Sequence, residues 1–173
     1  MEYSPEEYTR HYIVQALFKL MHAYDFENIK ITDITRKAGV GRATFYRYFK
    51  SKQDVILYYF EHITKEFKLN QRYIPRCKAD YIYIVKNVLT AFKNQAEPIK
   101  LIRKAHLEHI YLDYLNKNFV KTFEQGDMTE KAYSPYIYAG MLFNVSMKWL
   151  DNGCTDPIEE LAEIIINAIY FKD

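Results

Sequence analysis

The sequence has few residues that break helices or form compact loops. Its 173 residues include only 5 Gly, 5 Pro, 2 Cys and 1 Trp. Scarce glycine and proline, combined with apolar residues that repeat at helical spacing, predict an all-α protein. So few glycines also argue against a glycine-rich loop of the kind that holds nucleotide phosphates.

Cysteine pairs and long apolar runs are missing as well. Cys77 and Cys154 lie far apart and form no Cys-x-x-Cys motif, so we expect free thiols in a reducing compartment. No apolar run approaches the ~18 residues that a membrane-spanning helix needs. The polar, acidic start MEYSPEEYTR predicts no signal peptide. We therefore expect a cytoplasmic protein with no membrane partner.

Patterns for catalysis or metal binding are also lacking. The chain shows no Ser/His/Asp ordering and no paired acidic motif. His106 and His109 are three residues apart and can share a helix face, but no third and fourth ligand stands nearby. We expect no enzymatic activity, no metal and no cofactor.

The chain does contain two short helices joined by a tight turn, between Thr32 and Lys52. Thr32 is expected to cap the first helix, and Gly39 to end it in the left-handed conformation. Phe45 and Phe49, four residues apart, are expected to form the buried face of the second helix. This plan is typical of a helix-turn-helix, whose second helix enters the major groove of DNA.

The charge of this stretch is unusual for the chain. Between Lys30 and Lys52 seven basic residues stand against Asp33 alone, a net charge of +6, whereas the whole chain carries +2. Such a local basic patch is typical of a phosphate-binding face. The alternative is a solvent-exposed three-helix corner whose charges only keep it in solution. Tyrosines alternating with basic residues favour DNA binding, because Tyr hydroxyls and Arg suit phosphate and base contacts.

The segment KAGVGRATFYRYFKSKQDV resembles the signature of the tetracycline-repressor (TetR) family of bacterial transcription regulators. One departure is visible, because Lys30 stands where the family often has Thr, so the phosphate contact at the start of that helix is expected to differ. The resemblance covers about the first third of the chain. Its motifs are Ala38-Gly39-Val40, Thr44-Phe45-Tyr46, Tyr48-Phe49 and Lys50-Ser51-Lys52.

The resemblance implies an all-α fold of about nine helices. Residues 1–52 would form a three-helix helix-turn-helix DNA-binding domain, and residues 53–173 a helical ligand-binding and dimerisation domain. The implied function is a sequence-specific regulator that binds a pseudo-palindromic operator in double-stranded DNA as a homodimer. The resemblance further implies that this regulator is a repressor relieved by a small-molecule effector. The implied coupling runs through the helix that follows Lys52, which links the DNA-binding head to the body.

Positions in the motif assign DNA contacts by resemblance. Arg42, Ala43 and Thr44 are expected to face base edges, with Arg42 suited to read a guanine. Phosphate contacts are expected from Thr32, Thr44, Tyr46, Arg47, Tyr48, Lys50 and Lys52. Arg47 could contact either a phosphate or a base.

Capping patterns predict the other helices. Ser4-Pro5-Glu6-Glu7 opens a first helix, and Ser51 with Asp54 opens a fourth, which is expected to run to about Arg72. Further helices are expected at about residues 80–95, 99–105 and 107–123, from Ser134 to Gly153, and after Asp156. The buried stripe of the first helix is expected to be Ile13, Ala16, Leu17, Leu20, Met21 and Tyr24, with Phe26 filling the following loop.

Two groups of residues in the body are open to a functional and a structural interpretation. The first group would line a pocket for a small hydrophobic or aromatic effector, although such aromatic stripes more often belong to the core. Its members are Phe60, Phe67, Tyr81, Ile84, Val88, Tyr111, Tyr114 and Phe143. The last two helices resemble the family's dimerisation region, in which two helices from each subunit make a four-helix bundle. The alternative is that both helices pack only within one subunit. The expected interface residues are Ala139, Gly140, Phe143, Met147, Leu150, Ile158, Leu161, Ile165 and Ile169.

A second functional class stays open at this point. Some relatives serve as coactivators that bind another protein through the body and do not repress through DNA. The basic second helix argues against this alternative, because a coactivator has no need of Arg42, Arg47 and Lys50. An enzyme is the third class, and it lacks any supporting constellation.

Overall fold

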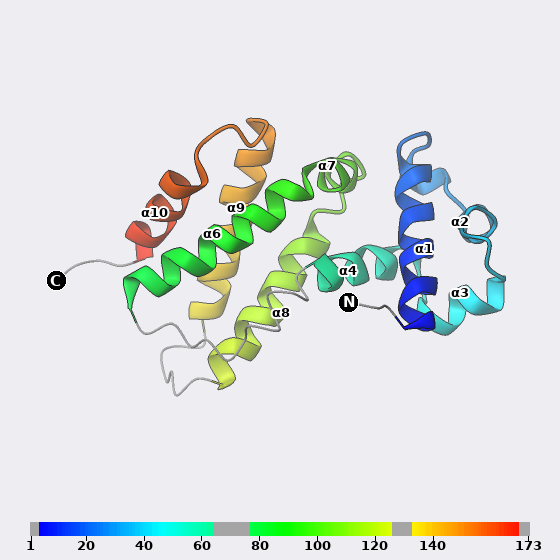
Figure 1. Cartoon of the computed structure of the whole chain (residues 1–173), viewed down its shortest axis with the longest axis horizontal. Helices are drawn as coiled ribbons and strands as arrows, with labels where there is room; N and C mark the ends of the chain where they lie inside the picture. The colour runs from blue at the N-terminus through cyan, green and yellow to red at the C-terminus, as the bar shows by residue number, and fades with distance from the viewer. Residues whose placement is uncertain (1–3, 64–76, 126–132, 170–173) are drawn as a thin grey trace. The chain divides into compact units, whose positions relative to one another are not determined.

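The computed structural model describes residues 4–63, 77–125 and 133–169. Within these residues the chain forms nine α-helices and one short 3₁₀ helix, η1, and no strand (Figure 1). The predicted all-α fold is confirmed. The helices group into two compact units, Met1–Phe60 with Glu97–Ile110, and Glu61–Ala96 with Tyr111–Asp173. The division of functions at residue 52 stays a prediction.

The first unit contains the predicted helix-turn-helix. Its elements are α1 (Pro5–Met21), η1 (Phe26–Asn28), α2 (Ile31–Ala38), α3 (Arg42–Tyr48), most of α4 (Lys52–Ile63) and most of α7 (Ala96–Lys104). Helix α1 packs against α2, and α2 packs against α3 (Figure 1). The core between them is apolar and includes the fully buried Ile13, Leu17, Ile34, Phe45, Val55 and Ile56.

Helix α1 begins as its sequence predicts. The Ser4 hydroxyl accepts the Glu7 backbone N–H at 3.2 Å, and the Glu7 carboxylate accepts the Ser4 N–H at 3.0 Å. Each bond satisfies a backbone donor that the helix itself leaves unpaired. The helix ends at Met21, so Tyr24 lies beyond it and is exposed, and its predicted place in the buried stripe is wrong. Phe26 is buried, which confirms its expected role in the loop.

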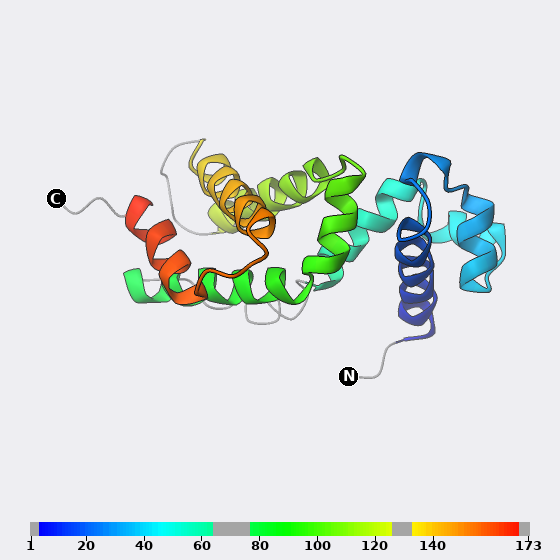
Figure 2. The ribbon, with the colours of Figure 1, turned by 90° about the horizontal axis from the view of Figure 1, so that it is seen from above.

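The second unit contains α6 (Lys78–Asn94), most of α8 (His109–Gln125), α9 (Ser134–Asp151) and α10 (Ile158–Ile169). Helix α10 lies along α6 (Figure 2) and buries Ala162, Ile165 and Ile166. An ion pair of 2.9 Å between Lys86 and Glu159 joins the two helices at the surface. The lysine ammonium and its hydrogen bond lower the pKa of the Glu159 carboxyl.

Trp149 is a central residue in the core of the second unit. Its side chain is 2% exposed, and its indole N–H donates to the Asp156 carbonyl at 3.2 Å. The ring stacks near Phe92 of α6 with centroids 6.5 Å apart. The Cys154 N–H also donates to the Trp149 carbonyl at 2.8 Å, so the turn after α9 is fastened to this residue twice.

Candidate nucleic-acid interface

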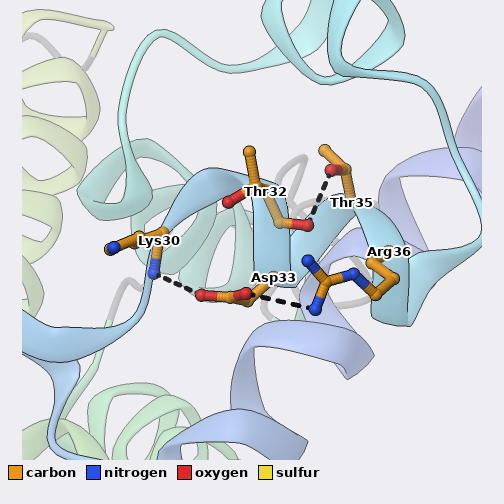
Figure 3. A network of polar contacts seen from close by, with 5 residues as sticks. All are labelled: Lys30, Thr32, Asp33, Thr35 and Arg36. Carbon is orange, nitrogen blue, oxygen red and sulfur yellow. Dashed lines mark hydrogen bonds and ion pairs between the residues drawn. The ribbon is translucent and has the colours of Figure 1, made fainter.

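The start of α2 is capped in a different way from the one that the sequence suggests (Figure 3). The helix begins at Ile31, and the Asp33 carboxylate accepts the Lys30 backbone N–H at 3.1 Å. The prediction that Thr32 caps this helix is wrong. The hydrogen bond between the Asp33 carboxylate and the Lys30 N–H places the capping position at Lys30, two residues earlier. Thr32 lies exposed in the first turn, where it is free to face a phosphate, and its carbonyl accepts the Thr35 hydroxyl at 3.1 Å.

Asp33 has a second partner within the same turn. Its other carboxylate oxygen lies 3.5 Å from the Arg36 guanidinium, which is itself well exposed (Figure 3). Asp33 is the single acidic residue between Lys30 and Lys52. It therefore caps α2 and offsets the charge of the adjacent Arg36, while the positive charges on α3 are left without a neighbouring carboxylate in the sequence.

The turn between the two helices forms as predicted. Gly39 ends α2 with φ at +69°, the left-handed region that glycine adopts at little cost. The Val40 N–H closes the turn by donating to the Thr35 carbonyl at 3.0 Å. A side chain at Gly39 would meet no atom within 4 Å, so the requirement for glycine is conformational and not steric. Helix α3 then starts at Arg42.

Helix α3 buries one face and exposes the other. Phe45 and Phe49 are buried, with ring centroids 5.8 Å apart, and Phe49 contacts Tyr58 of α4 at 5.6 Å. The outward face carries the exposed residues Arg42, Ala43, Tyr46 and Arg47, and Thr44 and Tyr48 are half-buried. The Arg42 guanidinium lies 5.6 Å from the Tyr46 ring centroid, so the two side chains lie together on the exposed face, one helical turn apart. Tyr46 is 46% exposed.

Arg10 is a residue of this region that sequence reasoning missed. Its guanidinium, from α1, lies 5.0 Å from the Tyr48 ring centroid and 5.5 Å from that of Tyr58. A second guanidinium, that of Arg47, lies 4.8 Å from the Tyr48 centroid. The Arg10 Nε is buried and has no hydrogen-bond partner among the described residues. These contacts tie the C-terminal end of α3 to both α1 and α4.

Replacing Arg10 with Met is expected to lower the free energy of unfolding by about 1 kcal/mol, because cation–π contacts contribute roughly 0.5–2 kcal/mol according to their exposure. Met retains much of the aliphatic part of the side chain and removes only the charged guanidinium group. Urea unfolding followed by helical circular dichroism would measure the change, and Lys19→Met, at an exposed position of the same helix, is the matched control. Equal midpoints for the two variants would contradict the role given to Arg10.

Helix α4 begins with the predicted Ser51–Asp54 capping box. The Ser51 hydroxyl accepts the Asp54 N–H at 3.1 Å, and the Asp54 carboxylate accepts the N–H groups of Ser51 and Lys50 at 3.1 and 2.8 Å. The Lys50 side chain is exposed. The Lys52 ammonium, by contrast, donates to the Phe26 and Ile29 carbonyls at 2.6 and 2.8 Å. Two of its three protons therefore have partners inside the protein.

The residues predicted to line an effector pocket fall on several elements. Tyr111 and Tyr114 of α8 are buried, and Tyr81, Ile84 and Val88 of α6 and Phe143 of α9 are half-buried. The Tyr111 ring lies 5.7 Å from Phe92 and 6.1 Å from Phe143, and burial raises the pKa of its hydroxyl. Phe60 is buried in the first unit, and Phe67 lies outside the described residues. The assignment of these residues to a pocket stays a prediction.

The residues predicted to form a dimer interface divide by burial. Ala139, Met147, Leu150 and Ile165 are already buried within one chain, so they offer little surface to a partner. The half-exposed members are Gly140, Phe143, Ile158 and Leu161, and the side chain of Ile169 is outside the described residues. The apolar side chains that α9 and α10 do expose include Tyr136, Ile137 and Ile164. Dimerisation itself stays a prediction.

His106 and His109 are both exposed at the junction of α7 and α8. His106 has φ at +56° and lies just beyond the end of α7. Within residues 4–63, 77–125 and 133–169, no three His, Cys, Asp or Glu side chains gather as a metal would require. None of the helices in these ranges is long and apolar enough to cross a membrane.

A basic, exposed α3 held on buried phenylalanines after a glycine turn defines the class of helix-turn-helix DNA-binding proteins. Residues 13–59 match the family described as bacterial regulatory proteins, tetR family. This match confirms the resemblance to the family that the sequence motifs indicate. Regulators of this family are transcription factors without enzymatic activity.

Solved structures resemble the chain over nearly its whole length. Lin0861 from Listeria innocua superimposes with a TM-score of 0.81 at 20% identity, covering 98% of this chain and 93% of that one. A TetR transcriptional regulator from Streptococcus agalactiae gives 0.63 at 16% identity, with 94% of each chain covered. The dihydroxyacetone kinase operon activator DhaS gives 0.59 at 18% identity, with 93% of each covered. No curated protein matches the chain.

Proposed function

We propose that this protein is a cytoplasmic, sequence-specific regulator of transcription that binds a pseudo-palindromic operator as a homodimer. The observation that carries the proposal is the outward face of α3. Arg42, Ala43, Tyr46 and Arg47 are exposed together on a helix whose opposite face is fixed by Phe45 and Phe49. A rigid helix with exposed Arg at its N-terminal end is what direct readout in the major groove requires.

Within this proposal the contacts divide into two kinds. Arg42, Ala43 and Thr44 face base edges, and the Arg42 fork can donate to both O6 and N7 of one guanine. Thr32, Tyr46, Arg47, Tyr48 and Lys50 hold phosphates and set the register of the helix, with Arg47 also within reach of a base. The net charge of +6 between Lys30 and Lys52 favours the approach of DNA to this face.

A homodimer places two such helices on two half-sites, about one helical turn apart. We propose that it acts as a repressor whose affinity is lowered by a small hydrophobic or aromatic effector. Such an effector would stabilise a conformation of the body in which the two heads are wrongly spaced. The alternative is a protein-binding coactivator of the same fold, and the exposure of Arg42 and Arg47 on α3 disfavours it.

Selection of bound sequences from random duplex DNA tests the proposal. The expected result is enrichment of an inverted repeat with half-sites of constant spacing. Binding should weaken steeply as salt increases, because lysines and arginines release counterions from the phosphates. Retention of DNA without any enriched sequence would contradict specific readout and would favour the coactivator.

Replacing Arg42 with Ala should weaken binding to the selected operator by about tenfold to a hundredfold and relax the preference at one base pair, because a bidentate pair with guanine contributes roughly 1–3 kcal/mol of discrimination. Fluorescence anisotropy on operator and base-substituted duplexes would measure both effects. Lys148→Ala is a charge-matched control at an exposed position of α9. An equal loss in both variants, with selectivity intact, would show that Arg42 contributes charge alone.

A further inference from the structure

The ammonium of Lys52 is enclosed by the turn that precedes α2. It donates to the Phe26 carbonyl at 2.6 Å and to the Ile29 carbonyl at 2.8 Å, and it lies 4.3 Å from the centroid of the Phe26 ring. Partial burial lowers the pKa of this lysine, and the nearby Glu27 carboxylate opposes that effect. The lysine is on the first turn of α4, so these bonds span 23 to 26 positions of the sequence.

The two carbonyls belong to a short segment whose Phe26 and Ile29 side chains are buried in the core. Phe26–Asn28 is a single turn of 3₁₀ helix, and its first residue has no side-chain cap before it. Ile29 directly precedes Lys30, whose N–H is bound by Asp33 to start α2. The position of Ile29 therefore sets where α2 begins and where the exposed Thr32 stands. The Lys52 ammonium adds two hydrogen bonds that join this segment to α4.

We propose that Lys52 is a positioning residue that holds the start of α2 against the start of α4, and that its ammonium does not bind a phosphate. This inference rests on the proposed DNA-binding function and changes the role of one residue within it. Two charge-assisted hydrogen bonds and an aromatic contact already occupy the ammonium. A phosphate would find at most one proton of this half-buried ammonium without a carbonyl partner, whereas the exposed Lys50, two residues earlier, reaches solvent.

Three variants separate positioning from phosphate binding. Lys52→Met removes the charge and keeps the stem, Lys52→Arg keeps the charge and changes the donor geometry, and Lys50→Met is the exposed control. Operator affinity is measured across a salt series at a temperature where each variant is fully folded. Each lost phosphate contact lowers the slope of log affinity against log salt by about 0.9, so a dimer that loses one contact per head changes by about 1.8.

The expected pattern is different for each position. Lys50→Met should lower the salt slope, whereas Lys52→Met should reduce affinity about tenfold with the slope unchanged. Lys52→Arg should also reduce affinity, because a planar guanidinium cannot replace a compact ammonium between two carbonyls. A slope that falls equally for Lys52→Met and Lys50→Met would overturn the proposal. So would full affinity in Lys52→Arg, or affinity in Lys52→Met equal to that of the unaltered protein.

Hydrogen exchange in the free protein tests, in the absence of DNA, whether Lys52 holds the start of α2. The Asp33 and Ile34 N–H groups donate to the Lys30 carbonyl, and in Lys52→Met they should exchange at least several times faster. In Lys50→Met their exchange should be unchanged, and identical exchange in both variants would overturn the proposal. If the unaltered protein enriches no sequence, the proposed function fails, and faster exchange at Asp33 and Ile34 would still show that Lys52 holds α2.

Discussion

Replacing Phe45 with alanine is expected to lower the free energy of unfolding of the first unit by about 3–5 kcal/mol, the usual cost of removing a buried phenylalanine. The side chain is 0% exposed and lies 5.8 Å from Phe49 and 5.6 Å from Tyr46, measured between ring centroids. It is the main apolar contact by which the seven-residue α3 is held to the core. So short a helix is not stable alone, so the loss of Phe45 should release it.

Urea unfolding followed by circular dichroism would measure this loss, and hydrogen exchange would locate it. Tyr46→Ala is the matched control, because it removes the adjacent aromatic ring from an exposed position of the same helix. We expect Tyr46→Ala to change stability by less than about 1 kcal/mol. A Phe45→Ala variant that unfolds at the same urea concentration as Tyr46→Ala would contradict the described core.

Replacing Trp149 with alanine is the second large effect, also expected at about 3–5 kcal/mol, and it should act on the second unit. The substitution removes a ring that is 2% exposed, its hydrogen bond to the Asp156 carbonyl and its contact with Phe92. The Lys93 ammonium, 5.7 Å from the ring centroid, also loses its aromatic neighbour. Because α9, α6 and the turn before α10 meet at this residue, we expect all three to exchange faster.

Trp149→Phe separates the two contributions of this residue. It keeps an aromatic ring and removes the indole N–H, so it should cost about 1–3 kcal/mol, mainly from the unpaired carbonyl and the lost volume. Tyr133→Ala, at a residue that is 76% exposed, is the control for loss of an aromatic side chain. If Trp149→Ala and Tyr133→Ala unfold together, the core assigned to the second unit is wrong.

Local features of the fold could be predicted because neighbouring residues determine them. Ser4 and Glu7, like Ser51 and Asp54, are three residues apart and bind each other's backbone, so the sequence alone marks both helix starts. Gly39 marks the turn for the same reason. The error at the Thr32 cap arose because Asp33 makes the capping bond from inside the helix, and the side chain of the preceding Lys30 has no acceptor.

Contacts between distant segments could not be predicted from spacing. Arg10 meets Tyr48 across 38 positions, and Lys52 meets Phe26 across 26, and neither pairing leaves a periodic pattern in the sequence. Burial within a chain and burial between chains are also indistinguishable in an apolar stripe. Ala139 and Ile165 have the spacing of an interface and are buried inside one chain. The candidate DNA-binding face was predictable because basic residues and a family motif coincide there.

The central claim is that the exposed start of α3 reads base sequence through Arg42, and it can be tested on a single atom of the DNA. In the selected operator each guanine is replaced in turn by 7-deazaguanine, which removes the N7 acceptor, and the affinities of the unaltered protein and Arg42→Ala are compared. We predict one guanine in each half-site whose replacement weakens the unaltered protein about tenfold and has no effect on Arg42→Ala. If every replacement affects the two proteins equally, Arg42 does not read a guanine and the account of this interface is wrong.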